Sequence, residues 1–224
     1  MSCWALLALK PPHLGKTRLA GTLSGTQRTQ LVRAMFERVL DALGAAGEID
    51  RVAVVTPDPG IVPHGVITLA DPGGGLNHAL DAGRRQAMAQ GADEILILHA
   101  DLPSLRADEV DTFVRHSRPA GLGFAPDRHG SGTNAIFLSP PGGFGFHFGA
   151  ASFERHLHEA RARAREHTVI TLPGFAVDIA EPADLQHFSG PRAGLLEPFL
   201  PHWSMTRWTT RPQHFSPSHA AEHG

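Results

Sequence analysis

Short apolar runs alternate with longer amphipathic stretches along most of this 224-residue chain, and this alternation limits the folds open to it. Apolar residues in the longer stretches recur at helical spacing, as at Leu31, Met35, Val39 and Leu43. Strands that alternate with helices are typical of the α/β class, a mainly parallel sheet with helices on both faces. Strands are predicted at 3–9, 52–55, 66–69, 95–98, 122–125 and 135–138, and helices at 26–43, 76–90, 107–116 and 152–165.

The chain length suits one α/β domain, and residues 1–200 are predicted to form it. Residues 201–224 are rich in proline, histidine, serine and tryptophan and lack periodicity, so we predict a mobile C-terminal tail. A metal site at His214, His219 and His223 is the weaker interpretation of this tail, because flexible histidines must be ordered before they chelate.

Composition argues against several classes of function. The formal net charge is −2 and 19% of the residues are charged, so no nucleic-acid partner is predicted. The single cysteine, Cys3, rules out an internal disulfide and a cysteine-based zinc site within one chain. The sequence has no run of about 18 apolar residues and no export signal, so we expect a cytoplasmic protein that does not enter a membrane.

Cations gather in the loop that follows the first predicted strand, where the sequence reads LKPPHLGKTR. Lys10, Lys16 and Arg18 lie within nine residues at the carboxyl end of the sheet, where ligands bind in such folds. Three cations there would suit a triphosphate. The loop is not a P-loop, because that motif needs glycine where this chain has Lys10. A solvated basic loop is the simpler alternative.

An acidic residue, Asp101, follows the most apolar predicted strand, in the sequence HADLP. It would lie at the floor of a cleft, where a buried carboxylate needs a cation to offset its desolvation. Mg²⁺ that bridges nucleotide phosphates fits, because it needs only one or two carboxylates. The alternative is that Asp101 caps the next helix. Asp178, after a short apolar run late in the chain, is either a second metal carboxylate or the end of a turn.

A glycine run, residues 73–75, precedes the second predicted helix and could let the backbone approach a ligand closely. It is not a dinucleotide fingerprint, because His78 stands where that motif has glycine. Asn77 could either cap the helix or pair with the edge of a base. An ordinary flexible turn explains the run equally well.

Two later segments offer neutral hydrogen-bond donors to an anion. In the loop 126–134, Gly130 and Gly132 leave the amides free, and Thr133 and Asn134 add side-chain donors. Residues 148–152 lead into the fourth predicted helix, whose first amides form a phosphate site.

Ser152 and His156 are four residues apart and therefore lie on one face of the fourth predicted helix. His156 either points toward the same anion as Ser152 or is a partly buried structural histidine. The two interpretations are equally supported by the sequence.

Six segments occur in the order found in the 2-phospho-L-lactate guanylyltransferase family: LKPPHLGKTRLA, GGGLN, LHADLP, DRHGSGTNAIFL, FGAASFERH and VDIAEPADL. The chain resembles that family from about residue 4 to residue 187. The resemblance implies a Rossmann-like nucleotide-diphospho-sugar transferase fold and a role in the biosynthesis of coenzyme F(420). It also implies GTP as donor, and 2-phospho-L-lactate, phosphoenolpyruvate or 3-phosphoglycerate as acceptor. A transient complex with the downstream transferase of the pathway is expected.

The resemblance also assigns roles to individual residues, with Mg²⁺ as the cofactor. Asp101 resembles the principal metal ligand and Asp178 the second one. Ala180 departs from the family, which usually has aspartate there, and this implies weaker metal binding if that side chain touches the metal. The nucleotide-binding positions correspond to Lys10, Lys16, Arg18, Gly75 and Asn77, and the acceptor-binding positions to Thr133, Gly149 and Ser152 with Asn134 beside them and His156 on the same helix face.

The implied reaction is in-line attack of an acceptor phosphate oxygen on the α-phosphorus of GTP, with release of pyrophosphate. A phosphomonoester, with its second pKa at about 6, is largely dianionic near neutral pH and needs no general base. Asp101 through Mg²⁺, together with Lys16 and Arg18, would be catalytic by neutralising the charge that develops.

Two alternatives to this reaction stay open. One is a sugar-phosphate nucleotidyltransferase or glycosyltransferase of the same fold, which the absence of a GxGTR loop disfavours. The other is a catalytically silent nucleotide-binding partner, which Ala180 suggests.

Overall fold

The structure is a computed structural model that describes residues 1–185. The predicted tail and the last part of the predicted domain lie outside the described residues. Each strand and helix predicted between residues 3 and 165 is present, and its ends differ from the prediction by at most three residues.

Seven strands form one sheet: β1 (Cys3–Ala8), β2 (Arg51–Thr56), β3 (Ile67–Ala70), β4 (Glu94–Leu98), β5 (Leu122–Pro126), β6 (Thr133–Leu138) and β7 (Thr168–Val169), in the order β3-β2-β1-β4-β6-β5-β7. β1 pairs in parallel with β2 and β4, so that Leu6 lies between Ala53 and Ile97. β6 runs antiparallel to both of its neighbours, β4 and β5. The loop 127–132 between β5 and β6 is too short for a crossover, which explains why this pair is antiparallel in a mainly parallel sheet.

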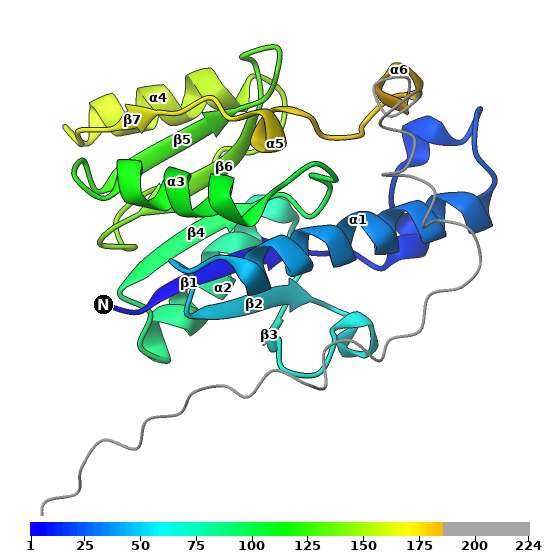
Figure 1. Cartoon of the computed structure of the whole chain (residues 1–224), viewed down its shortest axis with the longest axis horizontal. Helices are drawn as coiled ribbons and strands as arrows, with labels where there is room; N and C mark the ends of the chain where they lie inside the picture. Colours follow the sequence, from blue (N-terminus) through cyan, green and yellow to red (C-terminus); the bar gives the residue numbers. More distant parts are fainter. Residues whose placement is uncertain (186–224) are drawn as a thin grey trace, which may run out of the picture.

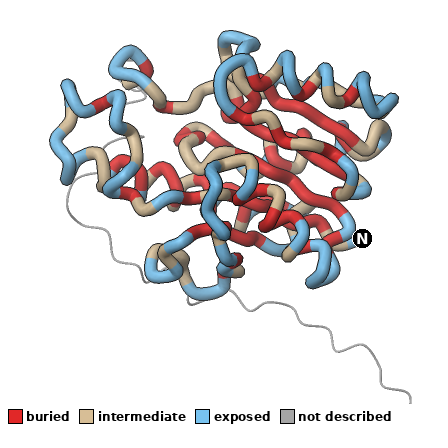
Figure 2. Tube along the Cα trace, turned by 180° about the vertical axis from the view of Figure 1, so that it is seen from behind, coloured by how far each residue is buried: buried red, intermediate tan, exposed pale blue. Residues whose placement is uncertain are grey.

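Four long helices cover the sheet: α1 (Gly25–Ala45), α2 (Leu76–Ala89), α3 (Ala107–Ser117) and α4 (Ser152–Ala162). α1 and α3 pack against one face, and α2 and α4 against the other (Figure 1). The central strands are therefore buried on both faces (Figure 2). Every residue of β4 is buried. The shorter helices are η1 (Pro12–Leu14), η2 (Thr17–Leu19), η3 (Pro59–Ile61), α5 (Pro173–Ala176) and α6 (Pro182–Leu185).

Local sequence fixes where the two helices nearest the site lie. α1 begins with a capping box, in which Ser24 Oγ accepts from the Gln27 amide (3.3 Å) and Gln27 Oε1 accepts from the Ser24 amide (2.9 Å). α2 lies directly on the sheet because residue 83 is glycine. A Cβ at Gly83 would come within 2.3 Å of Val55 Cγ2, so any side chain there would push α2 away from the sheet.

The amino end of the sheet is closed by buried and paired groups. The Glu94 side chain is 1% exposed, and Arg118 Nε donates to both of its oxygens (3.0 and 3.3 Å). Arg118 also pairs with Glu48. Nearby, Cys3 is buried, and this burial raises the pKa of its thiol to about 12. Within residues 1–185 no helix is long and apolar enough to cross a membrane.

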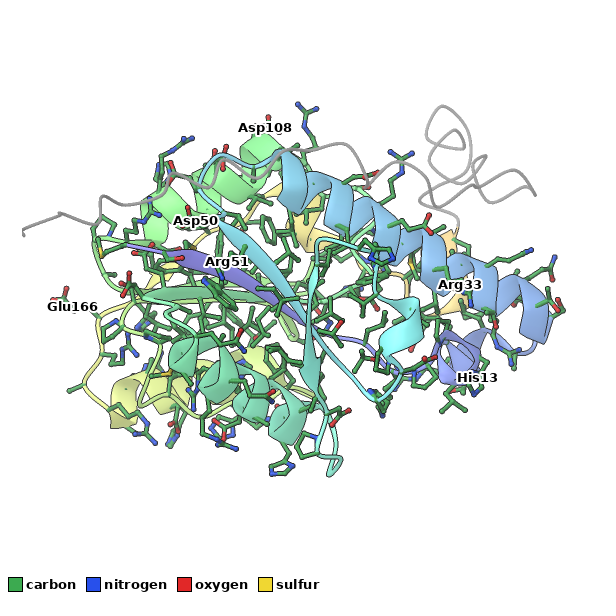
Figure 3. The ribbon with its side chains drawn as sticks, turned by 90° about the horizontal axis from the view of Figure 1, so that it is seen from below. His13, Arg33, Asp50, Arg51, Asp108 and Glu166 are labelled. Carbon is green, nitrogen blue, oxygen red and sulfur yellow. The ribbon has the colours of Figure 1, made fainter. Side chains whose placement is uncertain are left out.

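The carboxyl end of the sheet lies on the opposite side of the molecule. Asp50 and Arg51 mark the amino end of β2, whereas His13, in the loop after β1, lies at the other end (Figure 3). β1 and β4 are parallel, so the loops that follow them leave from the same end. The basic loop 10–18 and the segment 99–101 are thereby brought together.

Candidate active site

A cavity of about 230 Å³ lies at the carboxyl ends of β1 and β4. Apolar side chains from α1 and α2 form part of its wall, and Lys10, Lys16, His99 and Asp101 supply polar groups. An apolar wall with a few convergent polar groups is the usual form of a small-molecule site. Three of the predicted site residues, Lys10, Lys16 and Asp101, therefore line one cavity. His99, which was not predicted as a site residue, lines it with them.

Lys16 and Asp101 form the central ion pair of this site, in which the Lys16 ammonium donates to Asp101 Oδ2. Lys16 has a φ of 54°, a left-handed conformation that non-glycine residues seldom adopt. Gly15 lies so close to α1 that a Cβ would come within 2.9 Å of Val32 Cγ2. α3 begins at Ala107 with Arg106 as its N-cap residue, so the alternative that Asp101 caps this helix is wrong.

Two acidic side chains lie close to one another here. Burial alone would raise the pKa of Asp101, but Lys16 and His99 outweigh it and hold that pKa below its ordinary value. The pKa of Asp178 is raised by burial and by the charge of Asp101. Neighbouring half-buried carboxylates repel one another, and a divalent cation would relieve this repulsion.

The bonding of Asp101 is incomplete in a way that fits a metal. Its Oδ1 is buried, and no residue in the described part of the chain gives it a hydrogen bond. The nearest histidine nitrogen, His99 Nδ1, is 3.7 Å away. Residues 1–185 contain no group of three or more acidic, histidine or cysteine side chains that could hold a metal ion. The donor set of Asp101 and Asp178 therefore fits Mg²⁺ that takes its other ligands from nucleotide phosphates and water.

Arg18 lies outside the wall of the cavity. Its guanidinium is 3.5 Å from the Glu181 carboxylate, and the two side chains are 73% and 61% exposed. This pair joins the loop after β1 to the segment that leads into α6, and the two segments lie on the same side of the molecule (Figure 1). The structure thus does not bring Arg18 to Asp101, although the sequence grouped them.

The start of α2 is joined to the segment before α4. Gly75, with φ +95°, precedes α2 in a conformation that favours glycine. Asn77 does not cap the helix: its Nδ2 donates to the Phe148 carbonyl (3.1 Å), and its Oδ1 accepts from the Phe148 amide (2.7 Å). Gly149 follows, exposed and with φ +122°.

A network of neutral groups joins β6 to α4. Ser152 Oγ accepts from the Thr133 amide (2.9 Å). His156 Nε2 accepts from the His147 amide (2.9 Å), so Nδ1 carries the proton and donates to Thr133 Oγ1 (2.9 Å). Burial lowers the pKa of His156 to about 3. Thr133 and Ser152 therefore keep their hydroxyl protons available to donate. His156 positions Thr133 and does not face an anion, so it is the structural histidine of the two interpretations given above.

The loop between β5 and β6 does not offer the free amides that the sequence suggested. Asp127 Oδ1 accepts from the amides of His129 (3.1 Å) and Ser131 (2.9 Å). The Gly130 amide donates to the Asp127 carbonyl (3.1 Å). That expectation was wrong for these three amides, because an acidic residue at the start of the loop already satisfies them.

Comparison with known proteins identifies the family. Residues 4–189 match the family described as "Guanylyl transferase CofC like". The chain belongs to this family. A phosphoenolpyruvate guanylyltransferase of Sphaerobacter thermophilus is 42% identical over 194 residues, which are 85% of this chain and 94% of that protein. Another, from Rubrobacter xylanophilus, is 39% identical over 191 residues, which are 83% of this chain and 92% of that protein.

A solved structure supports the fold of this CofC-like guanylyl transferase. That structure is of a protein from Desulfovibrio desulfuricans G20, which is described as a nucleotide-diphospho-sugar transferase. It shares 17% identity with a TM-score of 0.70 over 88% of this chain and 95% of its own. The predicted fold class is confirmed, and the chain is an enzyme of the nucleotidyltransferase class.

In this guanylyl transferase, the segment that carries Asp178 is held at its upstream side by two hydrogen bonds. Asn134 Nδ2 donates to the Phe175 carbonyl (2.8 Å), and the Arg128 amide donates to the Ala176 carbonyl (2.8 Å). Asn134 is 3% exposed, so its carboxamide supports the Asp178 segment.

The downstream side of this segment is held by Asp184. Its Oδ2 accepts from the amides of Ala180 (2.7 Å) and Glu181 (2.6 Å), and Arg128 pairs with its other oxygen. Ala180 thus contributes through its backbone amide. Neither Arg128 nor Asp184 was predicted from the sequence, in which Asp184 is the last of three acidic residues in VDIAEPADL.

Proposed function

We propose that the protein transfers GMP from GTP to the phosphate of phosphoenolpyruvate. An oxygen of the acceptor phosphate forms a bond to the α-phosphorus of GTP. The bond from that phosphorus to the oxygen bridging to the β-phosphate breaks, and this oxygen keeps the electron pair and leaves with pyrophosphate. The names of the two relatives support phosphoenolpyruvate as the acceptor.

The unpaired, buried oxygen of Asp101 is the observation that carries this proposal. Asp101 and Asp178 would hold Mg²⁺, which would neutralise negative charge on the triphosphate. Lys16 already lies on the Asp101 carboxylate and lines the same cavity, so its ammonium would add positive charge beside the phosphates.

The neutral network suits an acceptor that brings its own charge. Phosphomonoesters lose their second proton at about pH 6, so the attacking oxygen is already deprotonated near neutral pH. His156 is buried and bonded through both ring nitrogens, so it takes no proton. The hydroxyl protons of Thr133 and Ser152 would orient the acceptor phosphate.

2-Phospho-L-lactate and 3-phosphoglycerate are the alternative acceptors. They share the carboxylate and phosphate with phosphoenolpyruvate and differ in small groups that a few side chains can distinguish. We further propose that the product enters coenzyme F(420) biosynthesis in the cytoplasm and passes to the downstream transferase of that pathway.

One assay tests the proposed function. Purified protein is mixed with GTP, Mg²⁺ and each acid in turn, pyrophosphate is followed, and the product is identified by mass. We expect pyrophosphate release only with acceptor, fastest with phosphoenolpyruvate, and none after EDTA removes the metal. GTP binding without acceptor-dependent release would instead support the catalytically silent partner, and release with a sugar phosphate would support the sugar-nucleotide alternative.

A further inference from the structure

We infer that Asn77 is a positioning residue for the acceptor: it anchors the segment before α4 to α2 through both polar atoms of its carboxamide. This inference rests on the proposed function, because it assigns the anchored segment to the acceptor side. It departs from the role that sequence resemblance gave Asn77, which was contact with the nucleotide.

The two hydrogen bonds between Asn77 and Phe148 close a ring between parts of the chain that lie 71 residues apart. Nδ2 donates to the Phe148 carbonyl at 3.1 Å, and Oδ1 accepts from the Phe148 amide at 2.7 Å. A carboxamide that pairs with the edge of a base needs one donor and one acceptor on the same edge. In Asn77, both the donor and the acceptor of the carboxamide are already bonded to the Phe148 backbone.

α2 is the fixed partner in this contact. Ala79 and Leu80, two and three residues after Asn77, are buried, and Gly83 brings the helix directly onto the sheet. The segment around Phe148 has no regular secondary structure, and its backbone depends on side chains for support. Loss of the Asn77 bonds would therefore loosen the backbone at Phe148 and leave α2 in place, while the His147 amide stays bonded to His156.

Phe148 connects the two sides of the site. Its ring lies 5.3 Å from that of His99, which lines the cavity with Asp101, and 4.9 Å from that of His156, which bonds Thr133. Phe148 thus contacts a residue on the metal side and a residue on the acceptor side.

The chain after Phe148 has little freedom to compensate. Gly149 has φ +122° and Ala151 has φ +50°, and Ser152 then begins α4. Left-handed conformations at a non-glycine residue persist only when their surroundings enforce them. Without the anchor, this stretch would relax, and the Ser152 hydroxyl would meet the acceptor in only a fraction of molecules.

The variant Asn77→Ala tests the inference. Alanine is the best helix former, so the substitution removes both hydrogen bonds without weakening α2. Three quantities are measured: hydrogen exchange at the Phe148 amide, the Kd for GTP without acceptor, and the KM for phosphoenolpyruvate. We expect faster exchange at Phe148, a GTP Kd within about twofold of wild type, and an acceptor KM about tenfold higher if the segment is competent about a tenth of the time.

The neighbouring variant His78→Ala is the matched control. His78 lies in the same helical turn, but its ring contacts the Gly73 carbonyl (2.7 Å), so the Phe148 bonds stay intact. Its acceptor KM and its exchange at Phe148 should match wild type. An equal rise in acceptor KM in both variants would show general loosening of the turn and overturn the inference.

Two further outcomes would overturn it. A higher GTP Kd with an unchanged acceptor KM in Asn77→Ala would return Asn77 to the nucleotide. Unchanged exchange at Phe148 would show that the anchor does not hold this segment. If the wild-type protein releases no pyrophosphate with any of the three acids, the proposed function fails, whereas the exchange measurement still tests the anchor separately.

Discussion

One acidic residue lies at the amino end of β4 and another lies just beyond its carboxyl end. Only the first of these two residues is fully paired. At the amino end, Glu94 receives Arg118 on both carboxylate oxygens. Three residues beyond the carboxyl end, Asp101 receives Lys16 on one oxygen, and its other oxygen is buried without a hydrogen bond from residues 1–185. Asp178 adds a second carboxylate at this end.

This difference separates a structural use of charge from a functional one. Buried charge is expensive, and a cluster that only stabilises the fold would be expected to satisfy each oxygen, as the cluster around Glu94 does. Two neighbouring carboxylates, one with an unsatisfied oxygen, are typical of a site that receives a cation. Changes at the carboxyl end should therefore lower kcat, whereas changes at the amino end should not.

The largest effect is expected from Asp101→Asn. The amide keeps the shape of the side chain but loses the charge that would hold Mg²⁺, so kcat should fall on the order of 10³-fold, equivalent to about 4 kcal/mol. The midpoint of thermal unfolding should also fall, because Lys16 loses its charged partner, so kcat is compared at a temperature where both proteins are folded. Turnover near that of wild type would contradict the metal role of Asp101.

Glu94→Gln should lower stability without lowering kcat. It removes the charge that faces Arg118, which is only 32% exposed but keeps Glu48 as a second partner. We expect the free energy of unfolding in a urea titration to fall by about 2 kcal/mol, less than for a fully buried pair. The kcat should stay at the wild-type value, and a large loss of kcat would break the distinction between the two ends.

Asp184→Asn should weaken the metal side indirectly. Asp184 orders the amides that follow Asp178, and supporting residues of this kind typically change metal affinity by about 10–100-fold. The Mg²⁺ concentration for half-maximal activity and Mn²⁺ binding measured by EPR in the presence of GTP would both report this shift.

Asp108→Asn is the matched control, because Asp108 pairs with Arg106 on the exposed surface of α3. If Asp184 acts through Asp178, the double variant with Asp178→Asn should be no worse than Asp178→Asn alone. Additive losses would show that Asp184 acts elsewhere.

His156 should make the acceptor side sensitive to acid. Burial lowers its pKa from the ordinary value of 6.5 to about 3 in the folded protein. Below pH 6.5 the unfolded chain therefore binds a proton at this histidine that the folded chain does not bind. Stability is complete above pH 6.5 and falls as the pH drops toward 3, by at most about 1.4 kcal/mol per pH unit. The difference in unfolding free energy between wild type and His156→Gln should shrink between pH 7.5 and 5, and a constant difference would contradict the neutral buried histidine.

The smallest effect is expected from Glu181→Gln. Glu181 pairs with Arg18 at the exposed edge of the site, and exposed pairs contribute about 0–1 kcal/mol. If Arg18 binds the triphosphate, its release should lower the KM for GTP by about twofold, whereas a higher KM would show that the pair supports the loop. Initial rates at saturating acceptor are sufficient to measure this change.

The sequence predicted that Lys16 and Asp101 meet, but it did not predict the partners of Asn77, Asn134 and His156. Lys16 and Asp101 follow parallel strands, and the geometry of such a sheet brings its carboxyl ends together. Asn77 and Asn134 were predicted as ligand contacts, and His156 as either a ligand contact or a structural histidine. Asn77 and Asn134 instead bond to groups 71 and 41 residues away, and His156 bonds to groups 9 and 23 residues away. A carboxamide or an imidazole in a sequence does not reveal its partner, because that partner is chosen by tertiary packing.

The fold shows the same limit. Helical and strand periodicity located the long elements, but periodicity says nothing of direction, and only the short connection to β5 indicates that β6 is reversed. Neither Arg128 nor Asp184 belongs to a periodic pattern, so the hydrogen bonds that hold Asp178 were not foreseen.

The buried thiol near the start of β1 makes the protein convenient for spectroscopy. Cys3 is the only cysteine among 224 residues, and with a pKa of about 12 it is almost never a thiolate at neutral pH. A maleimide dye should therefore not label the wild-type protein. It should label the variant Ala150→Cys at a single site, because position 150 is exposed and lies next to Gly149. Fluorescence from that dye would follow the acceptor segment in real time while GTP and acid are added.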